Sequence, residues 1–160
     1  MLVWLWRHSH AFGGSSPIIS GNIVYDNLGY YGAGINAEVG STPSIENNII
    51  FRNQALYGPG IFCWSTAKPI IINNTIVNNI ASSNGGGVIC SEGSDPTLIN
   101  NIIYGNSAHI GKQIFIDDNQ SDPHFLYCNI QAGQEGFSGN GAGVNYSGLY
   151  ENNIDVDPAF

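Results

Sequence analysis

The chain has 160 residues, enough for one folded domain with a buried core. Only 10% of its residues are charged, whereas it contains 21 glycines, 20 asparagines and 22 isoleucines, a composition that disfavours a protein built from long helices. Its 12 acidic and 4 basic residues give a formal net charge of −8, which repels nucleic-acid phosphates and anionic membranes alike. We therefore expect neither nucleic acid nor a membrane as a partner.

We interpret residues 1–16 as an N-terminal cap or partial coil. The apolar run 1–6 is too short for a secretory signal or a membrane span, so the chain shows no export signal of its own. Residues 3–6 are similar to a strand of the regular coils that follow, and 7–16 would then form a loop leading into the first complete coil.

Internal repetition is the main signal in the rest of the chain. Five prolines recur at intervals of 26 or 27 residues, namely Pro17, Pro43, Pro69, Pro96 and Pro123. Alignment on these prolines brings asparagines into one column, Asn22, Asn48, Asn74 and Asn101. A second asparagine column contains Asn27, Asn53, Asn79 and Asn106. A glycine column suited to turns contains Gly32, Gly58, Gly85 and Gly111.

Each repeat contains three short apolar runs that can bury their inward side chains only by stacking on neighbouring copies. We therefore predict an all-β, right-handed parallel β-helix of about five to six coils, each of 26–27 residues with three short strands. The whole chain, 1–160, would form a single β-helix domain. Residues 17–130 would form the regular coils, and 131–160 an irregular C-terminal coil whose ending suggests a piece of a longer chain.

The predicted inward positions form three apolar columns. The first strand contributes Ile19, Ile45, Ile71 and Leu98. The second contributes Val24, Ile50, Ile76 and Ile103. The third contributes Ile35, Ile61, Val88 and Ile114. The two asparagine columns lie at the bends, where their amides can form hydrogen-bonded ladders from coil to coil.

Cysteines and one arginine also fall into columns. Cys63 and Cys90 share an inward column on successive coils, which favours packing; a disulfide would need suitably oriented Cβ atoms. Arg52 shares a bend column with Asp26, so an ion pair between coils is its simplest role.

Several of these motifs carry a family resemblance. Pro-x-Ile-x-Asn-Asn-x-Ile, Gly-Gly-Gly-Val and the closing Tyr-Cys-Asn-Ile-Gln…Asn-Ile-Asp-Val-Asp-Pro-x-Phe resemble bacterial right-handed β-helix repeat proteins of the pectate-lyase-like superfamily. The resemblance covers about residues 17–160. It implies the fold and a secreted or cell-surface location within longer chains. It selects no activity, because the superfamily includes lyases, hydrolases, epimerases, tailspikes, adhesins and members without a known reaction.

Acidic side chains cluster in the turns that follow the third strand. Glu92 and Asp118 occupy equivalent places on successive coils, and Asp117 is adjacent. Carboxylate oxygens are the ligands that calcium prefers, so these three residues are candidate ligands for Ca²⁺, the only cofactor that the sequence indicates. A solvated acidic turn is the alternative.

Asp95 and Asp122 are also equivalent on successive coils, and Lys68 occupies the same column one coil earlier. Two carboxylates about 5 to 9 Å apart can act as acid and base on a glycoside. Lys68 would then be a lyase-type base, or it would simply pair with Asp95. These three residues are the catalytic candidates.

Large apolar residues occupy outward positions of the third strand, and we expect them to form an exposed face. They are Trp4, Phe62, Ile89 and Phe115, with Trp6 and Trp64 two residues further on. Such a face could mediate self-association, as a homo-oligomer or against the remainder of a longer parent chain. It could instead stack on the sugar rings of a polysaccharide.

The sequence thus predicts a structural or binding module that self-associates through this aromatic face and faces carbohydrate. The alternative is a polysaccharide lyase or glycoside hydrolase that uses the acidic turns.

Overall fold

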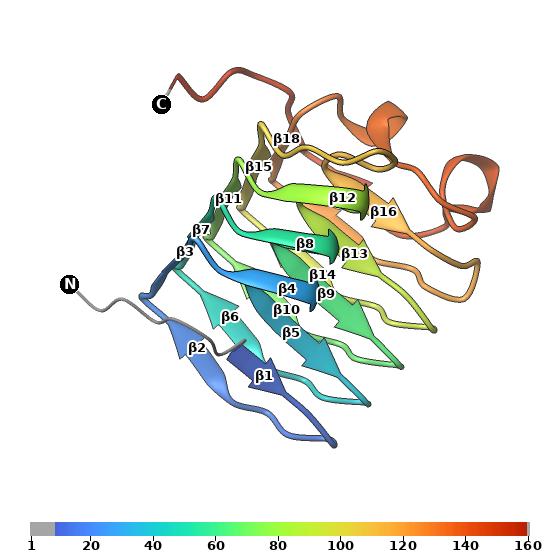
Figure 1. Ribbon diagram of the computed structural model, residues 1–160. Helices are drawn as coiled ribbons and strands as arrows, with labels where there is room; N and C mark the ends of the chain where they lie inside the picture. Colours follow the sequence, from blue (N-terminus) through green and yellow to red (C-terminus); the bar gives the residue numbers. More distant parts are fainter. Residues whose placement is uncertain (1–8, 160) are drawn as a thin grey trace.

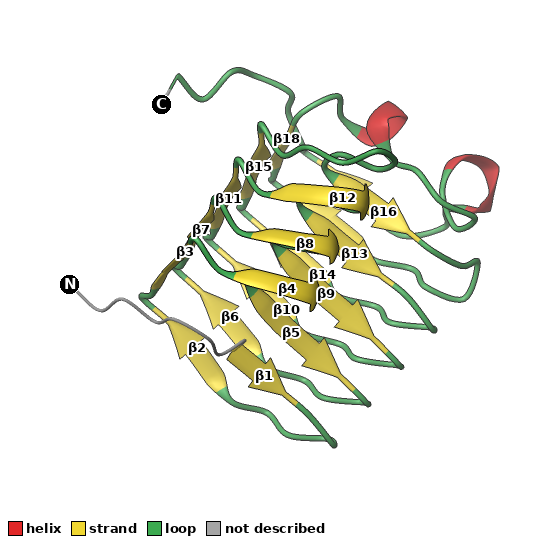
Figure 2. Cartoon of the chain, in the orientation of Figure 1, coloured by secondary structure: helices red, strands yellow, loops and turns green. Residues whose placement is uncertain are grey.

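The computed structural model describes residues 9–159, which form a parallel β-solenoid (Figure 1). Every strand pair is parallel, and each strand pairs with the strand at the equivalent place one coil away. The predicted all-β, right-handed parallel β-helix is therefore confirmed. Figure 2 shows short strands separated by bends, with helical turns only near the C-terminal end.

Four sheets run along the solenoid. One sheet contains β2 (Ile18–Ser20), β6 (Ser44–Glu46), β10 (Ile70–Ile72), β14 (Thr97–Ile99), β17 (His124–Leu126) and β19 (Tyr150–Glu151). The next contains β3 (Ile23–Tyr25), β7 (Ile49–Phe51), β11 (Thr75–Val77), β15 (Ile102–Tyr104) and β18 (Asn129–Ile130). A smaller sheet contains β4 (Leu28–Tyr31), β8 (Gln54–Tyr57) and β12 (Ile80–Asn84). The last contains β1 (Ser9–Ala11), β5 (Ile35–Glu38), β9 (Ile61–Trp64), β13 (Val88–Cys90) and β16 (Ile114–Ile116).

The small sheet of β4, β8 and β12 corrects the expectation of three strands per coil. These segments follow the second asparagine column and carry fewer apolar residues than the other strands, so their pattern predicted a turn. In the structure they are extended and pair with one another, for example Gly29 with Ala55 and Ala55 with Ala81. The four-strand coil gives the solenoid an extra wall, which becomes one side of the groove described below.

The N-terminal strand differs from the predicted one. β1 pairs Ser9 with Ile35 and Ala11 with Ala37, so residues 9–11 occupy the third-strand place before the first complete coil. The assignment of residues 3–6 to that place, with a loop over 7–16, is therefore wrong. Residues 3–6 themselves lie outside the described part of the chain.

The predicted inward columns form the core. Ile45, Ile71 and Leu98 are in register and fully buried, as are Ile61, Val88 and Ile114. The corresponding residues of the first coil, Ile19 and Val24, are only partly buried, because that coil has a neighbour on one side alone in these two sheets. Stacking on both sides is thus what buries each coil.

Two ladders of asparagine side chains run through the bends. In the first, the Nδ2 of each asparagine donates to the Oδ1 of the next coil, from Asn22 to Asn48, Asn74 and Asn101 at 3.0 Å each. The same Oδ1 atoms also accept the backbone N–H of the preceding coil, as in Asn48 to Asn74 at 2.9 Å. The second ladder, Asn27 to Asn106, repeats this pattern at 2.8 to 3.0 Å. The predicted ladders are confirmed.

The residue before each ladder asparagine has a left-handed backbone. At the first bend this holds for Asn47, Asn73 and Asn100, with φ of 54° to 56°. At the second bend it holds for Asp26, Arg52, Asn78 and Gly105. Asparagine, aspartate and glycine adopt this conformation most readily, which explains why they recur there. A glycine is also required between β8 and β9, because a Cβ on Gly60 would lie 2.1 Å from the carbonyl oxygen of Gly87.

Cys128 takes the place of an asparagine in the first ladder. The backbone N–H and the Nδ2 of Asn101 approach its Sγ at 3.5 and 3.9 Å, and its own N–H donates to the Oδ1 of Asn153 at 2.7 Å. Its thiol points to the carbonyl oxygen of Leu98 at 3.5 Å. A weakly polar sulfur thus stands where the other coils have an amide.

Residues 131–150 cover the C-terminal end of the stack. They contain two short 3₁₀ turns, η1 (Gln134–Gly136) and η2 (Gly143–Asn145), which appear at that end in Figure 2. Phe137, Tyr146 and Tyr150 pack around the buried ring of Phe125, at centroid distances of 4.9 to 6.5 Å. The expected irregular C-terminal region therefore acts as a cap on the apolar core.

The ladders predict a large stability loss from a single amide. Asn79→Ala would remove the acceptor of the buried N–H of Asn53 and one donor to the carbonyl of Ile50. We expect the free energy of unfolding in urea to fall by about 3 kcal/mol. Asn119→Ala, in an exposed turn, should change it by less than about 0.5 kcal/mol. Equal losses in the two variants would contradict a supporting role for the ladder.

The interrupted ladder predicts a stabilising change. Cys128→Asn would give Asn101 a full amide acceptor and let the new side chain donate to Leu98, so we expect a gain of about 1 kcal/mol in urea unfolding. The matched control is Cys90→Asn, which places the same amide in the apolar core and should cost about 1 to 3 kcal/mol. Destabilisation by both changes would rule out the ladder explanation.

Candidate functional site

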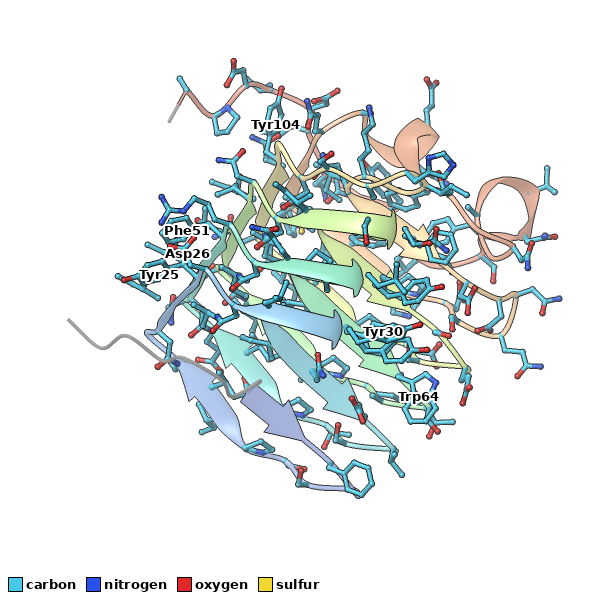
Figure 3. The ribbon with its side chains drawn as sticks, viewed as in Figure 1. Tyr25, Asp26, Tyr30, Phe51, Trp64 and Tyr104 are labelled. Carbon is cyan, nitrogen blue, oxygen red and sulfur yellow. The ribbon has the colours of Figure 1, made fainter. Side chains whose placement is uncertain are left out.

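A groove of about 570 Å³ lies where the small sheet meets the outer face of the sheet of β5, β9, β13 and β16. Its lining consists of Tyr31, Glu38, Tyr57, Phe62, Trp64, Asn84, Ile89, Ser91, Glu92, Phe115 and Asp117. This volume lies within the range of about 300 to 1,000 Å³ that is typical of small-molecule sites. In Figure 3, Tyr30 and Trp64 mark this side of the solenoid, whereas Tyr25, Phe51 and Tyr104 lie on the sheet of β3, β7 and β15.

The floor of the groove is a buried apolar column. Phe62, Ile89 and Phe115 are in register and are 8%, 2% and 8% exposed. The expectation that these residues form an exposed face is therefore wrong. The reason is the unforeseen fourth strand, whose C-terminal residue Tyr57 packs with Trp64 against this column.

Tyrosines at the strand ends form the wall of the groove. Tyr31 and Tyr57 are in register, and their rings stack with a centroid distance of 5.3 Å and an interplanar angle of 15°. Tyr31 also lies 5.8 Å from the ring of Phe62. Tyr31 is 51% exposed, and Trp64 is half-buried, so both present ring surface to solvent while Phe62 remains below.

A second outward column, two residues along from the floor, is polar and aromatic. It consists of Glu38, Trp64, Ser91 and Asp117, with Glu38 and Trp64 in register. The Oγ of Ser91 donates to Oδ2 of Asp117 at 2.8 Å. Glu38 and Asp117, at the two ends of this column, are three strand spacings apart, or about 14 Å. The groove thus has a carboxylate near each end and an indole between them.

The carboxylates of the acidic turns satisfy backbone groups. Asp118 accepts hydrogen bonds from the N–H groups of Glu92, Gln120 and Ser121 at 2.6 to 3.0 Å. Asp95 accepts the N–H of Asp122 at 2.9 Å, which confirms that the two residues are on adjacent coils. These contacts hold one turn against the next.

The three catalytic candidates lie outside the groove lining. The Nζ of Lys68 is 3.0 Å from Oδ2 of Asp95, so the pairing alternative for Lys68 matches the structure. Asp122 accepts the N–H and the hydroxyl of Ser147 at 3.2 and 3.0 Å. Catalysis by these residues stays a prediction. Arg52 similarly pairs with Asp26 through two hydrogen bonds, as expected.

Calcium binding also stays a prediction. Of its candidate ligands, Glu92 and Asp117 line the groove, whereas Asp118 supports its own turn. Over residues 9–159, no three acidic, histidine or cysteine side chains come together as a metal-binding group. Trp4 and Trp6, the remaining members of the predicted aromatic face, lie outside the described residues.

Sequence reasoning missed several residues of the groove, namely Tyr31, Glu38, Tyr57, Asn84 and Ser91. A signal for three of them was present, since Tyr31, Tyr57 and Asn84 each directly precede a member of the repeated glycine column. Their side chains reach the groove because that glycine turns the chain sharply into the next strand, with φ of 52° at Gly32 and 59° at Gly58.

The cysteines are buried free thiols. Cys63 and Cys90 are neighbours in the core, with Ala37 and Ile116 on either side, which confirms their packing role. Burial raises the pKa of the Cys63 thiol to about 12 and also raises the pKa values of Cys90 and Cys128. Thiolates are the nucleophilic form, so these residues are unsuited to nucleophilic chemistry.

These features define a right-handed parallel β-helix protein with a lateral aromatic groove. Two overlapping segments, residues 6–81 and 58–157, match the family model described as right handed beta helix region. The matches span most of the chain, which therefore belongs to this family, and the pectate-lyase-like superfamily agrees with the fold in general. Neither a curated protein nor a solved structure matches the chain. Within residues 9–159, no helix is long and apolar enough to cross a membrane.

The buried thiols predict a pH dependence. Because folding raises their pKa values, the unfolded chain loses thiol protons first once the pH exceeds the usual value of about 8.5. The contribution of the three thiols to the free energy of unfolding should therefore be constant below that pH and fall as pH rises toward about 12. At mildly alkaline pH, a thiol reagent should modify all 3 cysteines in urea and none in the folded protein. Rapid labelling of the folded chain would contradict this burial.

Proposed function

We propose that this chain is a glycan-binding module and that its ligand lies in the aromatic groove. The carrying observation is the combination of a stacked aromatic wall, an apolar floor and polar groups at the rim within one groove of about 570 Å³. Apolar surface with a few convergent polar groups is the usual composition of a ligand site.

Aromatic rings suit the faces of sugars. A pyranose ring presents C–H groups on its faces and hydroxyl groups at its edge, so it stacks on an aromatic ring while its hydroxyls meet polar partners. Trp64 and the exposed part of Tyr31 supply ring surface, with Tyr57 stacked on Tyr31. Asn84 and Ser91 supply hydrogen-bonding side chains within the same groove. Tyrosine and tryptophan also offer polar atoms of their own.

The repeat of the solenoid supports an extended ligand. Equivalent groove residues recur at the strand spacing of about 4.8 Å. One sugar unit in an extended polysaccharide advances by a similar length, so successive sugars would meet successive coils. The fixed register of Glu38 with Trp64 and of Tyr31 with Tyr57 keeps these contacts in line.

Two further proposals concern the setting. We propose that the module acts outside the cell or at its surface, where it would encounter polysaccharides, and that it does so within a longer chain or as a homo-oligomer.

Self-association was expected because Phe62, Ile89 and Phe115 were predicted to be exposed. These residues are buried, so that reason for self-association no longer applies. The alternative function, polysaccharide cleavage, needs an acid and a base, for which the groove offers Glu38, Glu92 and Asp117.

The binding proposal predicts a specific loss in Trp64→Ala. Removal of one stacking ring should weaken glycan affinity about two- to twelvefold, the effect of roughly 0.5 to 1.5 kcal/mol per aromatic contact. Affinity electrophoresis with a panel of neutral, acidic and amino polysaccharides measures it.

The control is Tyr104→Ala, which removes an aromatic residue of similar partial burial from β15, outside the groove (Figure 3). It should retain wild-type affinity. Equal binding by both variants would place the ligand elsewhere. Release of reducing ends from any polysaccharide by the wild-type chain, lost in Asp117→Asn, would replace binding by cleavage.

A further inference from the structure

We infer that a β-bulge in β12 aims Asn84 into the groove, where its amide selects glycans built of 2-acetamido sugars over glycans built of plain hexoses. This inference rests on the proposed glycan-binding function and adds the class of sugar and the residue that distinguishes it.

The groove wall contains one extra residue directly before Asn84. In three coils the second-ladder asparagine and the turn glycine lie five positions apart, whereas in the coil that contains β12 they lie six apart. In β12, the last strand of the small sheet (Figure 1), Ala81 pairs with Ala55 and Asn84 pairs with Tyr57, so three steps along β12 match two along β8. Such bulges are frequent beside functional sites, where they re-aim a side chain.

The bulge holds the amide of Asn84 in one orientation. The carbonyl oxygen of Ser83, within the bulge, accepts the N–H groups of His109 and Ile110 from the next coil at 2.9 and 3.2 Å. The hydroxyl of Ser83 donates to Oδ1 of Asn84 at 3.2 Å. Asn84 is half-buried and lines the groove. Because its oxygen already has a donor, its Nδ2 is the group that it offers to a ligand.

Apolar groups surround this donor. The wall position one coil away is the ring of Tyr57, which packs against the buried floor. Gly85 follows Asn84, and a Cβ on Gly85 would lie 2.0 Å from the Cγ1 atom of Ile89 in that floor. The wall therefore approaches the floor closely beside Asn84, and its amide donor stands next to apolar surface.

An acetamido group suits this combination. Its carbonyl oxygen can accept a hydrogen bond from Nδ2, while its methyl group gains free energy by leaving water for apolar surface. A hydroxyl on the same sugar carbon could also accept from Nδ2, but its own O–H would then face the apolar floor without an acceptor, which is unfavourable. Acetamido sugars should therefore bind more tightly than hexoses of the same linkage.

The test is titration calorimetry of the whole chain with two tetrasaccharides of the same β-1,4 linkage, one of N-acetylglucosamine and one of glucose. Both are uncharged and differ only in the group on C2 of each sugar, so the carboxylates of the groove do not bias the comparison. We expect the acetylated tetramer to bind about tenfold more tightly, through one additional hydrogen bond and one buried methyl group.

Asn84→Asp keeps the size of the side chain and replaces the donor by an acceptor. It should lower affinity for the acetylated tetramer about tenfold. It should not weaken binding of the glucose tetramer, whose hydroxyl can donate to the new carboxylate. The matched control, Asn119→Asp, makes the same change in an exposed turn outside the groove and should keep the wild-type preference. Circular dichroism shows that each variant is folded.

Deletion of Ser83 tests the bulge itself. The coil would then have the 26-residue length of the first two coils, so the variant should fold. It should still bind the glucose tetramer and should lose most of the preference for the acetylated one, because the amide of Asn84 is no longer aimed by the bulge. Retention of the full preference would contradict the role of the bulge.

Other results would overturn the inference in different ways. Equal affinity for the two tetramers in the wild type would leave glycan binding standing without selection for acetamido groups. A preference that persists in Asn84→Asp would exclude Asn84 as the selecting residue. Absence of binding by both tetramers, together with none in the wider polysaccharide panel, would overturn the proposed function as well.

Discussion

The amide hydrogen bonds between equivalent asparagines are the interaction on which the other features of this solenoid depend. Each bend of the backbone would otherwise bury N–H groups without an acceptor, at a cost of about 1 to 3 kcal/mol per group. In the ladders, Asn74 satisfies the N–H of Asn48 and the carbonyl of Ile45 while also bonding the next asparagine, Asn101. The bends therefore stack one above another, and this fixes the register of every strand between them.

Fixed register turns one repeated sequence into continuous surfaces. Successive side chains along a strand point to opposite faces of the sheet. Each column of inward apolar residues is therefore followed, one residue along, by a column of residues that face outward. At β9 and β13, the inward column is Cys63 and Cys90, and the outward neighbours are Phe62 and Ile89. The groove is built from outward columns, and its rim residues, such as Glu38 and Asp117, can vary without disturbing the inward core.

The core and both ladders were predictable because they depend on contacts that recur at 26 or 27 residues, and such contacts leave a period in the sequence. The groove was less predictable because it depends on the angle between two sheets. The pairing of Ala55 with Gly29 makes a fourth strand from a segment without a strong apolar pattern. That strand covers Phe62, which sequence alternation alone assigns to solvent. Cys128 was recognisable by its interval of 27 residues from Asn101, but its chemistry differs from that of the column it occupies.

The acidic residues of this chain divide into two groups with different physical roles. Asp95 and Asp118 accept backbone N–H groups across or within turns, and their charge is used in holding coils together. Glu92 and Asp117 belong to the same turns in sequence, yet they line the groove. Asp117 is tied to the stacked coils as well, because its Oδ2 accepts the hydroxyl of Ser91 on the neighbouring coil, so the stacking of the coils also holds a carboxylate in place at the groove.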